Sequence, residues 1–210
     1  MKKNRGSPMN QDRSAARSRE RLQLLCSGAL LCALLCVICP WSIPLTPVPV
    51  TLGSFAVCLI ALAFPLRLSL PAVGGYLFLG AVGVPVFAGW MGGLWKLTSP
   101  TGGYLIGYLP MVLCIGLLLP PDTGSARPAR RGFLLRIAAA LAGNLLLLLF
   151  GTLFYVLITG TPFPAALSVC VLPFLPGDAL KLTGAALLAP LLTRAAAAVS
   201  PKILAGGGRR

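Results

Sequence analysis

One carboxylate and one ammonium group lie three residues apart in an otherwise apolar stretch, at Asp178 and Lys181. Residues three apart on a helix share a face, so the two side chains are expected to project side by side. Pro176 and Gly177 are expected to stop the incoming chain, which makes Asp178 the predicted N-cap of the last helix. The pair offers an acceptor and a donor to a small solute with N–H groups and a carbonyl or carboxylate. The alternative is an internal ion pair that only anchors the last helix.

A glycine-rich segment with aromatic side chains, residues 84–108, is the second candidate for a binding site. Its candidate residues are Phe87, Trp90, Thr101, Gly103 and Tyr104. Glycine allows close backbone approach, and aromatic rings supply flat apolar walls with polar tips. The pattern predicts an irregular loop that lines an outward-facing cavity. A helix-packing surface with an aromatic belt at the membrane interface explains the same pattern equally well.

The composition indicates that lipid is the main solvent of the elements that must position these residues. Of the 210 residues, 57% are hydrophobic and 10% are charged, and the mean hydropathy is +0.87. A soluble domain is about half apolar and about a quarter charged. A chain with so few charges could not cover a water-facing surface, so an integral membrane protein is predicted.

Apolar runs divide the chain into about six predicted transmembrane helices, which makes the protein an all-α, polytopic bundle. A helix needs about 20 residues to cross a hydrocarbon core of about 30 Å. The predicted helices are Leu22–Cys39, Leu52–Leu66, Leu68–Ala88, Gly102–Leu119, Ile137–Ile158 and Ala179–Val199. The stretch Phe163–Pro176 is short and broken by prolines, so it is expected to be a re-entrant or interfacial piece.

Basic residues flank the apolar runs and predict the orientation. Of 18 basic residues, only Lys96 and Lys181 fall outside the segments assigned to the cytoplasm, which gives 16 inside and 2 outside. This excess predicts a multi-pass protein of the plasma (inner) membrane with both termini cytoplasmic. Residues 1–21 are then a basic cytoplasmic tail, 22–199 a transmembrane substrate-binding domain and 200–210 a cytoplasmic C-terminal tail. No basic face is interleaved with aromatic residues, so no nucleic-acid partner is expected.

Other classes of function find little support. The chain has no histidine, and its seven cysteines lie in apolar runs, where packing explains them better than a metal site. No nucleophile is placed between Asp178 and Lys181, so no catalytic residue is predicted. The sequence also lacks a nucleotide-binding P-loop. An intramembrane enzyme or a structural subunit remains the alternative from a different class.

Two small residues in the first predicted helix form a candidate helix–helix interface. Ala29 and Ala33 are four residues apart, and such a pair lets a second helix approach closely. In a chain rich in Ala and Leu this spacing is common by chance, so the pattern alone is weak.

Several motifs in order carry a resemblance to a known family. They are the segments 49–52, 83–89 and 100–104, the last being Pro-Thr-Gly-Gly-Tyr, and the Pro-Gly-Asp-x-x-Lys element at 176–181. Over roughly residues 45–195 the chain resembles the BioY family, the biotin-binding S components of energy-coupling factor (ECF) transporters. The resemblance implies a six-helix bundle that captures biotin near the outer face, without a cofactor. It also implies a membrane-embedded coupling subunit and two ATPase subunits as partners.

The resemblance implies roles for individual residues. Asp178 and Lys181 are expected to contact the ligand, with Asp178 assigned to the ureido N–H groups of biotin. Lys181 is expected to contact either the ureido oxygen or the valerate carboxylate. Ala29 and Ala33 match the element through which S components meet their coupling subunit.

The chain also departs from the family pattern. Many relatives have Gln where this chain has Gly53, and some carry Arg where it has Trp90 and Met91. A missing polar partner is expected to reduce affinity or to shift specificity toward a precursor such as dethiobiotin. An S component for another vitamin is therefore the alternative.

Overall fold

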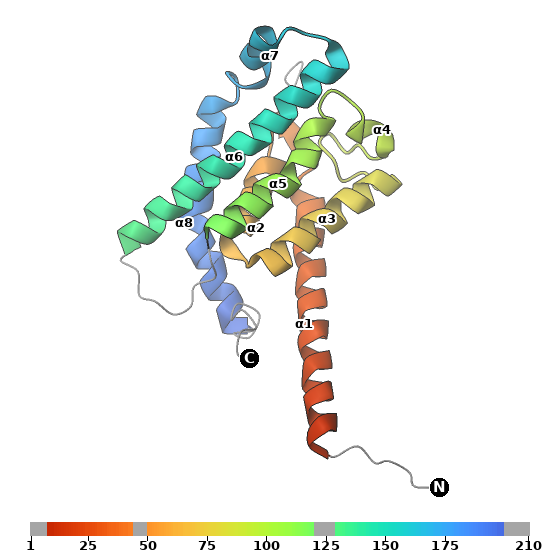
Figure 1. Ribbon diagram of the computed structural model, residues 1–210, viewed down its shortest axis with the longest axis vertical. Helices are drawn as coiled ribbons and strands as arrows, with labels where there is room; N and C mark the ends of the chain where they lie inside the picture. The colour runs from red at the N-terminus through yellow and green to blue at the C-terminus, as the bar shows by residue number, and fades with distance from the viewer. Residues whose placement is uncertain (1–7, 44–49, 120–128, 200–210) are drawn as a thin grey trace.

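The computed structural model describes residues 8–43, 50–119 and 129–199. These residues form eight helices and one short antiparallel ladder, which confirms the predicted all-α class (Figure 1). The helices are α1 (Pro8–Ile38), α2 (Gly53–Ala63), α3 (Leu66–Val82), α4 (Leu94–Leu97), α5 (Gly102–Leu118), α6 (Ala129–Thr159), α7 (Phe163–Cys170) and α8 (Leu175–Val199). The strands are β1 (Ser42–Ile43) and β2 (Val50–Thr51).

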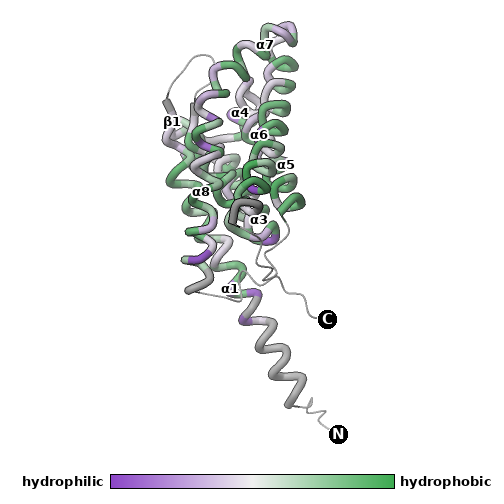
Figure 2. The backbone as a smooth tube through the Cα atoms, turned by 90° about the vertical axis from the view of Figure 1, so that its left-hand side faces the viewer, coloured by the Kyte–Doolittle hydropathy of each residue, from purple (hydrophilic) through white to green (hydrophobic). Residues whose placement is uncertain are grey.

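Six of the described helices are apolar, and three of them are long enough to cross a bilayer. Three stretches are long and apolar enough to cross a bilayer, at Arg21–Ile38, Gly132–Thr159 and Leu175–Ala196. The apolar helices α2, α3 and α5 are shorter, with 11, 17 and 17 residues. Leu157 and Leu180 are each 78% exposed, two of many large apolar side chains on the outer surface. Lipid is the environment that fits such a surface, and Figure 2 shows the apolar residues running along the bundle.

The arrangement of the helices gives the bundle two distinct ends. The first residues of α1 and the last residues of α8 lie at one end (Figure 1). The short helices α4 and α7 lie toward the other end. The first turn of α8, which contains Asp178, lies on the α7 side, because only residues 171–174 separate the two helices.

The last helix begins earlier than its sequence suggests. It starts at Leu175, and the Asp178 N–H donates to the carbonyl of Phe174 at 2.7 Å, so Asp178 lies in the first turn and is not the N-cap. The prediction was wrong because proline loses no hydrogen bond in a first turn, where the backbone N–H has no partner inside the helix. Pro176 therefore belongs to the start of the helix instead of stopping the chain.

Helix α5 packs closely on α6 through glycines. A Cβ on Gly107 would lie 3.1 Å from Cδ1 of Leu147, and a Cβ on Gly143 would lie 2.7 Å from Cγ1 of Ile115. Small residues at these points let the two backbones approach and bury their side chains. This contact fixes the two helices that face α8 across the interior of the bundle.

Candidate functional site

One cavity in the described bundle is lined by both polar and aromatic side chains. Its empty volume is about 690 Å³, which includes open space at its mouth. Its polar lining consists of Thr51, Ser54, Lys96, Thr101, Asp178 and Lys181. Its apolar and aromatic lining consists of Cys39, Tyr76, Phe87, Ala88, Tyr104, Leu105, Tyr108, Leu147, Leu148 and Phe174.

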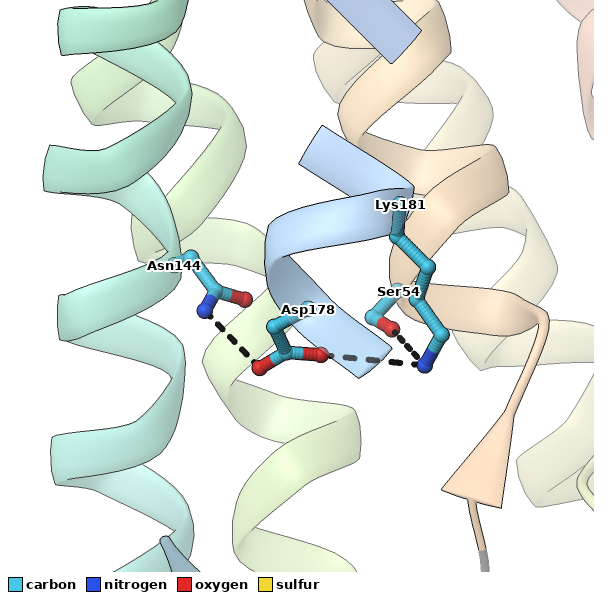
Figure 3. A network of polar contacts seen from close by, with 4 residues as sticks. All are labelled: Ser54, Asn144, Asp178 and Lys181. Atoms are coloured by element: carbon cyan, nitrogen blue, oxygen red, sulfur yellow. Dashed lines mark hydrogen bonds and ion pairs between the residues drawn. The ribbon is translucent and has the colours of Figure 1, made fainter. Parts of the chain in front are cut away.

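A polar network from three helices stands on one side of this cavity (Figure 3). On α8, Oδ1 of Asp178 lies 3.7 Å from Nζ of Lys181. The amide of Asn144, on α6, donates to Oδ2 of Asp178 at 2.9 Å. The ammonium of Lys181 donates to the hydroxyl of Ser54, on α2, at 3.3 Å. The network joins segments that are far apart in the sequence and fixes the orientation of both charged groups.

Burial makes this network costly to leave incomplete. Asp178 is only 6% exposed, and a buried carboxylate without partners carries a large desolvation penalty. Lys181 and Asn144 supply compensating donors, and the positive end of the α8 dipole favours an anion in the first turn. The predicted proximity of Asp178 and Lys181 is confirmed by their 3.7 Å separation.

Aromatic side chains form the apolar wall. The rings of Tyr104 and Phe174 have centroids 6.3 Å apart, and those of Tyr76 and Phe87 meet edge to face at 5.7 Å. The Tyr104 hydroxyl donates to the carbonyl of Cys170 at 3.0 Å, which holds the end of α7 against the wall. Gly151 of α6 makes room for the Tyr104 ring, because a Cβ there would overlap it. These contacts hold the Tyr104 ring in the wall of the cavity.

Lys96 adds a second cation at a different point of the lining. It lies in the four-residue helix α4, and its Nζ stands 5.6 Å from the centroid of the Trp95 ring. Burial lowers the pKa of the Lys96 ammonium below the usual value for lysine. Asp178, Lys181 and Lys96 are the charged residues of the described cavity lining. Because the first two compensate each other, the lining has a net charge of +1.

The structure brings five of the residues expected from the sequence to this cavity, namely Phe87, Thr101, Tyr104, Asp178 and Lys181. Trp90 is not part of the lining; it is 59% exposed, has a φ of +59°, and its ring meets that of Trp41 edge to face at 6.3 Å. Gly103 is not part of the lining either. It lies in the α5–α6 contact, where a Cβ would overlap Phe154.

Tyr108, an aromatic residue of the segment 84–108, also lines the cavity, whereas sequence reasoning missed Ser54, Lys96 and Asn144. Asn144 carried a signal, because it is the strongly polar side chain within the long apolar run 137–158, and such residues in membrane helices usually serve a site. Ser54 carried none, since a hydroxyl group is ordinary in an apolar helix and only its neighbours in space distinguish it.

The small-residue pair on α1 points away from the bundle. Ala29 and Ala33 are exposed, whereas Leu31 and Leu35 on the same helix are buried. The other face of α1 packs on α3, where a Cβ on Gly75 would lie 3.4 Å from Sγ of Cys32. The alanine face is therefore accessible to another helix.

Comparison with known proteins gives one consistent family. The model of the BioY family matches residues 9–198. The biotin transporter BioY of Thermotoga maritima is 38% identical over 159 residues, which cover 74% of this chain and 87% of that protein. For BioY2 of Lactococcus lactis the identity is 36%, with 76% and 82% covered. For the probable biotin transporter BioY of Pyrococcus horikoshii it is 34%, with 78% and 92% covered.

A solved structure shares the fold. The crystal structure of the S-component for biotin from an ECF-type ABC transporter aligns with a TM-score of 0.75 at 22% identity, and the alignment covers 84% of this chain and 93% of that one. This likeness confirms the predicted S-component-like bundle. The family match extends over nearly the whole chain and includes the Pro-Thr-Gly-Gly-Tyr and Pro-Gly-Asp-x-x-Lys elements. The chain therefore belongs to the BioY family.

Proposed function

We propose that this protein is the substrate-binding S component of a biotin uptake transporter. The observation that carries the proposal is the arrangement of polar groups in the cavity, which matches the two polar ends of biotin. Biotin has a ureido ring with two N–H donors and one carbonyl, a fused sulfur ring and a valerate chain that ends in a carboxylate. Each of these parts has a counterpart in the lining.

The ureido ring fits the Asp178 network. A carboxylate offers about four lone-pair sites. In the structure one of them accepts from Asn144, while Lys181 is an ion-pair partner at 3.7 Å. The remaining acceptor sites are enough for the two ureido N–H donors. Lys181 and Ser54 stand beside them as donors for the ureido oxygen, so we assign Lys181 to that oxygen and not to the carboxylate.

The carboxylate fits Lys96. The net charge of +1 in the lining calls for a monoanion, and the charge of Lys181 is already compensated by Asp178. Lys96, by contrast, forms no ion pair with another residue that the structure describes. The hydroxyl of Thr101, also in the lining, adds a neutral donor.

The sulfur ring and the methylene chain fit the aromatic wall. Phe87, Tyr104 and Phe174 line the cavity with apolar atoms, and apolar surface that becomes buried on binding contributes about 25 cal/mol per Å². Gly103 contributes indirectly, since it lets α5 and α6 approach and so sets the position of Tyr104. Trp90, exposed beside Trp41, is assigned to the mouth of the site.

The transporter setting follows from the same proposal. The basic flanks support a plasma-membrane protein with both termini in the cytoplasm and the cavity toward the outer side. The exposed face of Ala29 and Ala33 is the surface offered to a membrane-embedded coupling subunit. Two ATPase subunits bound to that subunit would supply the energy.

The first test is binding of radiolabelled biotin to the detergent-purified chain, with excess dethiobiotin and riboflavin as competitors. Saturable binding that riboflavin does not displace is expected, because riboflavin lacks both the ureido ring and the carboxylate. Absence of binding in protein shown to be folded would overturn the assignment to biotin, and other vitamins would then be tested.

A further inference from the structure

The absence of a side chain at Gly53 makes room for atoms of residues that line the cavity. A Cβ at this position would lie 2.6 Å from the hydroxyl of Tyr108, 3.4 Å from Oγ1 of Thr51 and 3.5 Å from Sγ of Cys39. All three of these residues line the cavity. The backbone of Gly53 has no positive φ, so its conformation does not require glycine. Glycine is required because a side chain at this position would overlap the Tyr108 hydroxyl.

The Tyr108 hydroxyl occupies that space. Tyr108 comes from α5, is 4% exposed and reaches across to the first residue of α2. The next residue along α2, Ser54, accepts a hydrogen bond from the ammonium of Lys181. The phenol therefore places a further polar group at the α2 side of the cavity, where the ureido carbonyl of the proposed ligand is expected.

We propose that Gly53 and Tyr108 act as a pair that determines ligand specificity, with Gly53 providing the room and the Tyr108 hydroxyl providing the ligand contact. The inference rests on the proposed biotin site, whose polar end the pair extends. A side chain at position 53 would have to displace the hydroxyl by about 0.8 Å to reach the 3.4 Å of ordinary contact. Because Tyr108 is enclosed, its ring would move into the cavity.

A double-variant cycle tests this coupling. Gly53→Ala should weaken biotin binding by about tenfold or more, as overpacking of a closed site does. Tyr108→Phe should weaken it by about 3- to 10-fold, the range for one neutral hydrogen bond. The double variant should bind better than Gly53→Ala alone, because removal of the hydroxyl removes the overlap. Gly74→Ala is the matched control, since a Cβ there meets nothing within 4 Å.

Two further measurements test whether the loss of affinity comes from the contact between Gly53 and Tyr108. Dethiobiotin lacks the second ring, so Gly53→Ala should lower the affinity ratio of biotin to dethiobiotin, and the double variant should restore it. Thermal unfolding without ligand should show the same rescue in Tm. If the wild type does not bind biotin, the Tm cycle still tests the steric pair while the proposed function fails. A double variant no better than Gly53→Ala in binding and in Tm, or a Gly53→Ala affinity within twofold of wild type, would overturn the inference.

Discussion

Replacement of Lys96 by Gln tests which residue receives the ligand carboxylate. A hydrogen bond to a charged group contributes about 1.5–3 kcal/mol, which corresponds to about 10- to 150-fold in affinity. Lys96 is half-buried in α4, so solvent screens part of its charge and the lower part of this range applies. We expect Lys96→Gln to weaken biotin binding by about 10- to 50-fold.

The assay compares biotin with biotin carboxamide, in which the carboxylate is replaced by a neutral amide. Equilibrium binding of both ligands is measured in the wild type, in Lys96→Gln and in Lys181→Gln. Lys96→Gln should reduce the affinity for biotin while changing that for the carboxamide by less than about threefold. Lys181→Gln should weaken both ligands, because they share the ureido oxygen.

The reasoning would be refuted by the opposite pattern. If Lys96→Gln weakens both ligands equally, Lys96 only supports the fold of the α4 segment. If Lys181→Gln removes the preference for the carboxylate, the two lysines have been assigned to the wrong ends of the ligand.

Three further predictions follow from the same geometry. Asp178→Asn should weaken biotin binding by at least about 100-fold, because it removes a charged acceptor for two N–H groups and leaves Lys181 unpaired; an unchanged Kd would exclude a ligand role. Ala29→Leu should spare binding but impair biotin uptake in cells with the full transporter; normal uptake would remove this face from the partner contact. The preference for biotin over its carboxamide should fall as pH rises through the pKa of Lys96, because the deprotonated amine no longer attracts the carboxylate. Burial lowers this pKa, so the fall should begin below the value of about 10.4 for a free lysine. The affinity ratio is titrated in the wild type and in Lys96→Gln, and an identical profile in both would contradict the prediction.

The class of protein and its principal charged pair could be predicted from the sequence. Apolar runs of membrane length follow directly from composition, because burial of backbone hydrogen bonds in lipid leaves helices as the only structure for such segments. The adjacency of Asp178 and Lys181 is likewise local, since three residues of helix bring two side chains onto one face.

The remainder of the site depends on contacts that no local pattern encodes. Asn144 lies 34 residues from Asp178, and Ser54 lies 127 residues from Lys181, yet both complete the network. Tyr108 meets Gly53 only because α5 packs beside the start of α2. Conversely, Trp90 belongs to the aromatic segment in sequence but lies outside the cavity lining. Periodicity fixes which residues share a face of one helix, whereas the packing of helices decides which faces meet, and that packing is set by side-chain shapes from the whole chain.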